Sequence, residues 1–368
     1  MASTQSLKDP KQLHVAMFPW LAFGHILPFL ELSKFITQKG HKVSFLSTTR
    51  NIRRLPSSHL SPLVNLVELT IPCVQELPQN AEATMDVHTD DVHYTTEVDA
   101  YRLGMTIKGS DCIFIRHCYE FEPQWLTLLE ELHHLPVVPV GLMPPETPTN
   151  VGDEKDDAWI TVKKWLDCQQ KGHVVYVALG SEVTVSKTEL GELALGLELS
   201  GLPFFWTLRK TAAGSANSTE LPDGFSERTR NRGVVWTSWV PQLQILSHES
   251  VGGFLTHCGW GSICEGLTFG HPLIMLPFLV DQGLNARAMV DKQVGIEVPR
   301  NEEDGSFTKA SVAGSLRSVF VDDEGKIYKA NAMELSRVFG NMKLQKKYID
   351  NFTEYLEKKR CVAADDHI

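Results

Sequence analysis

A chain of 368 residues, 42% of them hydrophobic, is long enough to bury two cores, which predicts a globular protein of about two domains. A formal net charge of -10 without any basic block argues against a nucleic-acid partner, because no cationic cluster is present to replace phosphate counterions. The seven cysteines lack C-x-x-C spacing, and the N-terminus is polar without a long apolar run. We therefore expect free thiols, a cytoplasmic location, and neither export nor a membrane span.

Short β-branched or aromatic runs alternate with amphipathic segments along most of the chain. Strands are predicted at residues 13–18, 42–47, 111–116, 137–141, 174–180, 204–209, 234–236, 252–257, 272–277 and 294–299. Helices are predicted at residues 26–38, 157–169, 187–200, 242–248, 262–269, 283–292, 308–321, 326–339 and 344–359. This alternation is typical of an α/β fold in which crossover helices cover parallel sheets.

The two halves of the chain differ in regularity. An acidic, proline-containing linker at residues 143–156 separates a domain at 1–142 from a domain at 157–343, and residues 344–368 end the chain. The second domain alternates regularly enough for a full doubly wound sheet. The first has no convincing strand between about residues 72 and 103. A loop of that length in a compact domain indicates an incomplete set of elements.

The segment from Trp239 to Gln282 resembles, over 44 positions, the signature of plant family 1 UDP-dependent glycosyltransferases. It reads WVPQLQILSHESVGGFLTHCGWGSICEGLTFGHPLIMLPFLVDQ, and residues 18–28, 163–169, 176–182 and 221–229 add to the similarity. The resemblance implies a GT-B fold of two facing Rossmann-like domains, with the C-terminal helix returning to the N-terminal domain. It also implies that the N-terminal domain is shortened near residues 85–100, by on the order of a hundred residues or about three strand-helix units.

The resemblance implies that the C-terminal domain binds a UDP-sugar. Trp239 would stack on uracil, because an indole pairs well with the face of a base, and the Val240 backbone would read the base edge. Gln242 and Glu265 would bind the ribose hydroxyls. The alternative for Trp239 is an ordinary core tryptophan. Ser262 and Glu265 also form the capping-box pattern S-x-x-E, which a helix start favours without any ligand.

The diphosphate would lie at the turn between the strand at 252–257 and the next helix, where free N–H groups and the helix dipole favour an anion. The residues implied there are Ser181, His257, Trp260, Gly261 and Ser262. Asp281 and Gln282 would receive the sugar hydroxyls. The family usually reads HCGWNS, and this chain reads HCGWGS. The variant resembles the branch that adds a sugar to an acceptor that is already a glycoside.

His25 follows the first strand in FPWLAFGHILP and is the expected general base for the acceptor hydroxyl. The alternative is a histidine that caps the helix at 26–38. In the family an aspartate on a later strand orients this histidine, and the residues expected to carry that strand are missing here. Asp90, Asp91 and Asp99 lie near the junction. The spacing of His88, Asp90, Asp91 and His93 fits no ordinary zinc site, so we expect no metal.

The resemblance predicts an inverting, metal-independent O-glycosyltransferase that needs no cofactor and uses UDP-glucose as its co-substrate, with UDP-rhamnose and UDP-xylose left open. The acceptor would be a small hydrophobic metabolite, such as a flavonoid or terpenoid glycoside, and the protein a monomer. The alternative is a truncated or impaired member that binds a UDP-sugar without transfer. An oxidoreductase is disfavoured because no G-x-G-x-x-G follows the first strand.

Overall fold

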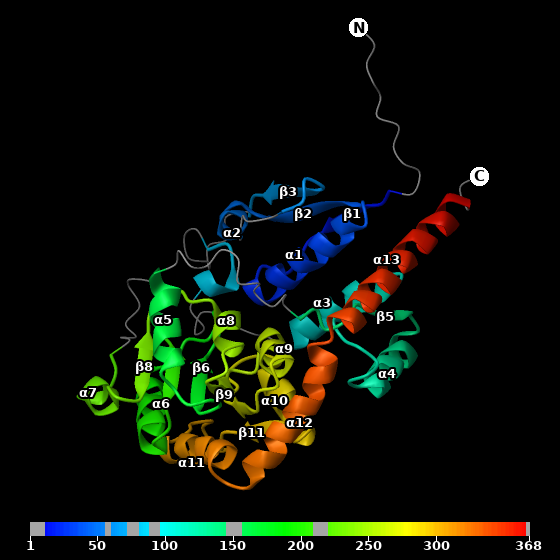
Figure 1. Ribbon diagram of the computed structural model, residues 1–368. Helices are drawn as coiled ribbons and strands as arrows, with labels where there is room; N and C mark the ends of the chain where they lie inside the picture. The colour runs from blue at the N-terminus through cyan, green and yellow to red at the C-terminus, as the bar shows by residue number, and fades with distance from the viewer. Residues whose placement is uncertain are drawn as a thin grey trace. The chain divides into compact units, whose positions relative to one another are not determined.

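The computed structural model describes residues 12–55, 60–71, 81–87, 96–144, 157–208 and 220–365 (Figure 1). Contacts divide the chain into two units, the first made of Met1–Met143 with Met342–Ile368 and the second of Pro144–Asn341. Each unit has its own hydrophobic core. Among the residues in those ranges, no helix combines the length and apolar character needed to cross a membrane.

The second unit contains one parallel six-stranded sheet. Its strands are β6 (Val174–Ala178), β7 (Phe204–Thr207), β8 (Gly233–Trp236), β9 (Val251–Thr256), β10 (Leu273–Met275) and β11 (Gly295–Glu297). The order is β11-β10-β9-β6-β7-β8. From β6 the sheet extends through β7 to β8 on one side and through β9 and β10 to β11 on the other. This order confirms the predicted doubly wound sheet and places its switch point between β6 and β9.

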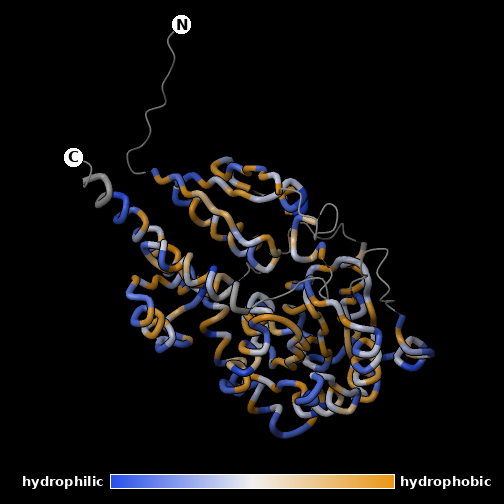
Figure 2. The backbone as a smooth tube through the Cα atoms, turned by 180° about the vertical axis from the view of Figure 1, so that it is seen from behind, coloured by the Kyte–Doolittle hydropathy of each residue, from blue (hydrophilic) through white to orange (hydrophobic). Residues whose placement is uncertain are grey.

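Helices cover both faces of this sheet, as the alternation predicts. They are α5 (Asp157–Asp167), α6 (Lys187–Ser200), α7 (Phe225–Thr229), α8 (Gln242–Leu246), α9 (Trp260–Thr268), α10 (Gln282–Asp291), α11 (Lys309–Phe320) and α12 (Glu324–Phe339). The sequence predicts all of them except the short α7. Figure 2 shows hydrophobic residues concentrated on the strands inside the unit and hydrophilic residues on the surrounding helices and loops.

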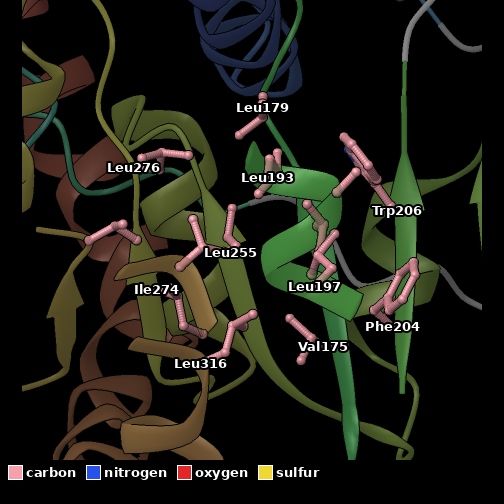
Figure 3. Packing of buried hydrophobic residues seen from close by; sticks show 14 of the residues in the cluster. Val175, Leu179, Leu193, Leu197, Phe204, Trp206, Leu255, Ile274, Leu276 and Leu316 are labelled. Carbon is pink, nitrogen blue, oxygen red and sulfur yellow. The ribbon is translucent and has the colours of Figure 1, made fainter. Parts of the chain in front are cut away.

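Alternate residues of β6 face opposite layers of helices, as the period of two in a strand requires. Val175 and Val177 belong to a cluster with leucines of α6 and α11, and Figure 3 shows Leu193 and Leu197 of α6 within it. Tyr176 points the other way and stacks on Phe254 of β9, with ring centroids 5.2 Å apart. The same strand therefore builds one core and sends a hydroxyl toward the opposite helical layer.

The first unit is built on two smaller parallel sheets. One contains β1 (His14–Met17), β2 (Lys42–Thr48) and β3 (Val64–Leu69), and the other pairs β4 (Ile113–Ile115) with β5 (Val137–Pro139). The helical segments are α1 (Phe23–Gln38), α2 (Thr49–Arg54), the 3₁₀ turn η1 (Thr84–Asp86), α3 (Thr96–Lys108), α4 (Pro123–His133) and α13 (Met342–Asp365). β3, α2, α3 and α4 have no counterpart in the sequence prediction.

The long helix α13 ties the two sheets of the first unit together. Phe352 of α13 lies in one buried cluster with Ile26 of α1, Phe45 of β2 and Val140, which follows β5. Polar contacts reinforce this packing, because Gln345 Oε1 accepts a hydrogen bond of 2.6 Å from the backbone N–H of Leu142. The C-terminal helix thus supplies core that the short sheets do not supply alone.

Helix α3 exposes its large apolar side chains. The exposed fractions of Tyr101, Leu103 and Met105 are 69%, 62% and 50%. A helix of 13 residues is marginal in water unless an apolar face packs against something. The helix begins at the point where the sequence predicts that strand-helix units are missing.

We predict that Tyr348→Phe destabilises the protein by about 1–3 kcal/mol. The Tyr348 hydroxyl accepts from the Tyr119 backbone N–H at 2.8 Å and donates to Glu120 Oε2 at 2.7 Å, and its residue is only 7% exposed. The variant leaves both partners without that hydroxyl. Denaturant unfolding measures the loss. Tyr328→Phe in α12 is the control, since no hydrogen bond of that hydroxyl is present among the described residues, and equal losses in both variants would contradict the prediction.

Candidate functional site

The loops that follow β6 and β9 meet at the switch point of the second sheet. Ala178 pairs with Thr256 in the parallel ladder, so Gly180 and His257 leave the sheet side by side. A methyl group on Gly180 would lie 2.5 Å from Cε1 of His257, and the φ angle of Gly180 is +75°. Only glycine satisfies both conditions. Ser181, the next residue in the loop, is therefore held beside the turn that carries His257.

The N-terminus of α9 forms the floor of this turn. The helix begins at Trp260 after the N-cap Gly259, which has no side-chain capping bond. The first N–H groups of a helix have no intrahelical acceptor and lie at the positive end of its dipole, which suits an anion such as a diphosphate. The structure excludes the capping-box alternative, because Ser262 is already inside the first turn and Glu265 lies beyond it. A side chain at Gly261 would meet nothing within 4 Å.

His257 is held uncharged in this turn. Burial lowers the pKa of His257 to about 4, although the nearby Asp281 carboxylate opposes the shift. Its Nδ1 is buried and has no hydrogen-bond partner among the described residues. At neutral pH the imidazole would therefore interact with a phosphate as a neutral hydrogen-bonding group, and the backbone amides would supply most of the positive potential.

Three polar side chains form a connected group on the opposite face of β6. Tyr176 Oη donates to Gln242 Oε1 at 3.0 Å, and Gln242 Nε2 donates to Glu265 Oε2 at 2.5 Å. The structure brings together the two residues implied for ribose binding and adds Tyr176, which the sequence analysis missed. The only signal in the sequence was a hydroxyl inside an apolar strand. The side-chain carbonyl of Gln242 and one of its amide hydrogens are therefore already in hydrogen bonds, and the second of these bonds orients the carboxylate of Glu265.

Trp239 presents its ring to solvent. It is 70% exposed, whereas its neighbour Val240 is 8% exposed and packs inward. The alternative of a core tryptophan is therefore wrong. A large exposed indole is suited to stacking on a base.

The two residues implied for the sugar lie where the loop after β10 meets α10, with Asp281 as the N-cap and Gln282 as the first residue of the helix. Asp281 is exposed, and Gln282 is only 7% exposed. Gln282 Oε1 accepts from the backbone N–H groups of Phe278 at 2.9 Å and Leu279 at 3.0 Å. The carbonyl end of this glutamine thus shapes its own loop, and a contact with a sugar hydroxyl would have to come from Nε2.

Cys258 is not a nucleophile candidate, although it lies in the same turn. It is fully buried, and burial raises the pKa of its thiol well above the usual range. Within the described ranges no group of three histidine, cysteine, aspartate or glutamate side chains is arranged to hold a metal ion. His88, Asp90, Asp91 and His93, whose spacing the sequence analysis compared with zinc sites, lie outside those ranges.

His25 belongs to the first unit and lies in the first turn of α1. The N-cap of α1 is Ala22 and no side chain caps it, so the alternative of a capping histidine is wrong. His25 is exposed, and the preceding loop exposes Phe18 and Trp20 by 63% and 65%. Of the possible aspartate partners, Asp99 lies in α3 and the two others lie outside the described residues.

Comparison with known proteins finds glycosyltransferases, both by family model and by similarity along the whole chain. The family model described as "UDP-glucoronosyl and UDP-glucosyl transferase" matches residues 151–346. The chain is 51% identical to UDP-glycosyltransferase 91D2 of Stevia rebaudiana over 475 positions, covering 100% of each protein. It is 36% identical to soyasaponin III rhamnosyltransferase of Glycine max, covering 97% of this chain and 98% of the relative.

Two solved structures illustrate the structural similarity. A UDP-glucose: anthocyanidin 3-O-glucosyltransferase in complex with UDP superimposes with a TM-score of 0.75 at 22% identity, covering 93% of this chain and 98% of the other. Arabidopsis thaliana UGT89C1 complexed with UDP-L-rhamnose gives a TM-score of 0.71 at 23% identity, with coverages of 94% and 99%. These matches confirm the GT-B fold class.

The alignment with the Stevia protein is longer than the chain. It spans 475 positions, and the chain has 368 residues, so at least 107 positions have no residue here. A shortening near residues 85–100 stays a prediction.

We predict that Gly180→Ala weakens UDP binding about tenfold or more and costs about 1–3 kcal/mol of stability. The added methyl group collides with the His257 ring and the positive φ strains any other residue. Gly191→Ala in α6, outside the site, is the matched control, because the space beside it is open and a helical glycine replaced by alanine gains about 0.4–1 kcal/mol. Calorimetry with UDP and denaturant unfolding would measure both. Similar behaviour of the two variants would refute this account of the turn.

Proposed function

This chain belongs to the UDP-glucoronosyl and UDP-glucosyl transferase family, and we propose that it is an inverting O-glycosyltransferase whose donor is UDP-glucose. It is an enzyme, a UDP-glycosyltransferase that uses a UDP-sugar donor and a small-molecule acceptor. The proposal adds the sugar, the stereochemistry and the kind of acceptor. A monomeric state and a cytoplasmic location stay predictions from the sequence.

One observation carries the donor side of the proposal. The turn at residues 257–259, the N-terminus of α9 and Ser181 converge at the switch point of a doubly wound sheet, which is where such sheets bind nucleotides. Glu265, oriented by Gln242, lies on α9 at the next turn, at a place suited to ribose. The exposed ring of Trp239 precedes α8, where it would cover the base.

The chemistry requires a base and a stabilised leaving group. In the proposed mechanism His25 takes the proton of the acceptor hydroxyl while that oxygen forms a bond to the anomeric carbon. The bond from the anomeric carbon to the diphosphate oxygen breaks on the opposite face, so the configuration inverts. The electron pair leaves with UDP, whose added charge would lie at the amides of α9. The neutral His257 would donate a hydrogen bond to the same group.

Glucose is favoured over rhamnose and xylose because the resemblance associates a final glutamine, here Gln282, with glucose. Rhamnose is the main rival. The relative from Glycine max is named a rhamnosyltransferase, and a structural neighbour was solved with UDP-L-rhamnose. Both sugars present hydroxyls that could donate a hydrogen bond to the exposed Asp281 carboxylate.

An apolar acceptor is supported by Phe18 and Trp20. They lie on the loop that leads to His25, and each exposes more than half of its surface. Exposed aromatic rings beside a catalytic base provide a surface for a hydrophobic aglycone. The HCGWGS variant favours an acceptor that already carries a sugar, such as a flavonoid or terpenoid glycoside.

The alternative, a UDP-sugar-binding protein without transfer, has its own supporting observation. The apolar residues of α3 are exposed, and the alignment contains at least 107 positions without a residue in this chain. If the missing positions fall in the first unit, walls of the acceptor site and the partner of His25 are among them. Donor binding would survive such a loss and transfer would not.

The distinguishing experiment measures binding and transfer on the same preparation. Calorimetry would give affinities for UDP, UDP-glucose, UDP-rhamnose and UDP-xylose, and mass spectrometry would detect products on a panel of flavonoid and terpenoid glycosides. We expect UDP-glucose to bind most tightly and to give the most product. Binding without any product would favour the alternative, and absence of binding would contradict both.

We predict that His25→Ala lowers transfer by about 10²–10⁴-fold, the usual contribution of a general base. UDP affinity should change by less than about 0.5 kcal/mol, because the imidazole acts on the acceptor. His14→Ala, which removes another exposed histidine of the first unit, is the control and should retain wild-type transfer. Unchanged transfer in His25→Ala would remove this residue from the mechanism.

A further inference from the structure

We infer that Asn285 is a positioning residue that holds the Asp281 carboxylate against the phosphate-binding turn. The inference rests on the proposed function, because it takes Asp281 as the acceptor of a donor-sugar hydroxyl. Asn285 lies in the first turn of α10, outside the segment that carries the family resemblance. Its amide connects two loops that leave neighbouring strands of the sheet.

Both hydrogens of one amide group are used in this connection. Asn285 Nδ2 donates to Asp281 Oδ2 at 2.9 Å and to the backbone carbonyl of Cys258 at 3.1 Å. The first bond fixes the side chain implied for the sugar, and the second holds the turn between His257 and Gly259. Neither an ionised carboxylate nor an alanine at this position would donate either bond.

The backbone on both sides of the connection is strained. Cys258 has a φ angle of 68° and Val280 of 50°, in the left-handed region that non-glycine residues and β-branched residues above all avoid. Such conformations cost of order 1–3 kcal/mol each and persist only where surrounding contacts impose them. Asn285 contacts the carbonyl of the first strained residue and the side chain next to the second. The Gln282 bonds to Phe278 and Leu279 hold the other side of the same loop.

The hydrogen bond from Asn285 also opposes an electrostatic repulsion on the Asp281 carboxylate. The Asp281 carboxylate opposes the fall in the pKa of His257, so the two groups are close enough to interact. An exposed carboxylate near a bound diphosphate would swing away from it, because like charges repel. The donor hydrogen of Asn285 holds Oδ2, and no described residue donates to Oδ1. That oxygen remains accessible to a sugar hydroxyl.

The inference predicts a loss specific to the sugar. Asn285→Ala should lower kcat/KM for UDP-glucose by between ~10-fold and ~100-fold, the effect of misplacing a substrate-orienting group by about 1 Å. Affinity for UDP, which has no sugar, should change by less than about threefold, a margin that allows for the weakened turn. Asn285→Asp should be worse than Asn285→Ala because a second carboxylate would lie beside Asp281. Asn285→Gln, which keeps both donors, should recover part of the loss.

A double-mutant cycle separates positioning from general stability. If Asn285 acts through Asp281, then Asn285→Ala should change kcat/KM by less than about threefold in an Asp281→Ala background, which is no more than the weakened turn alone would cause. Asn331→Ala is the matched control, since Asn331 Nδ2 also bonds a backbone carbonyl of the same unit, that of Gln293 at 3.0 Å, away from the turn. It should behave as wild type. Denaturant unfolding would confirm that each variant is folded.

The outcomes distinguish this inference from the proposed function. Additive effects in the cycle, or an Asn285→Ala variant equal to Asn331→Ala, would overturn the role of Asn285 and leave the proposed function intact. A wild-type protein that binds no UDP-glucose would overturn both. If the wild type binds but transfers nothing, the ratio of the UDP-glucose and UDP affinities replaces kcat/KM, and an unchanged ratio in Asn285→Ala would overturn the inference.

Discussion

The parallel pairing of β6 with β9 is the constraint on which the rest of the donor unit depends. β6 and β9 are the first and fourth strands of this sheet in chain order, and they pair at the switch point. Two loops that are distant in sequence therefore leave the sheet as neighbours. Their closeness requires glycine at position 180, since the ring of His257 fills the space that any side chain would need. Tyr176 on the same strand reaches Gln242 and, through it, Glu265. One ladder thus arranges both the residues proposed for the phosphate and those proposed for the ribose.

The proposed donor site would hold an anionic ligand mainly through backbone N–H groups. The chain is acidic, with a formal net charge of -10, and burial keeps His257 uncharged at neutral pH. Positive potential comes from the backbone of α9, whose free amides are fixed before a ligand arrives. Because Gly261 adds no side chain, this potential is unobstructed. With so little positive charge in the proposed site, the position of Asp281 is important, because a poorly held carboxylate would repel the diphosphate.

The first unit shows where prediction from local patterns fails. β3 reads VNLVEL, in which Asn65 and Glu68 interrupt the apolar residues and weaken the strand signal. Tyr101 and Met105 lie on one side of α3 and Leu103 on the other, and all three are exposed, so this part of the sequence lacks the period of a half-buried helix. Stability here comes from distant sequence, because Phe352 and Tyr348 of α13 complete the packing around β1, β2 and the residues after β5. No local pattern contains that information.

The sequence by itself determined the α/β class, the doubly wound second sheet, nearly all of its helices and the family, because periodicity and a 44-residue resemblance are local properties. It left open whether Ser262 and Glu265 form a cap, whether Trp239 is core and whether His25 caps α1. Tertiary structure decided each of these, since a helix start two residues earlier and the exposure of an indole follow from packing. Tyr176 and Asn285 also emerged only in three dimensions, because hydrogen bonds between different strands and loops have no fixed spacing in a sequence.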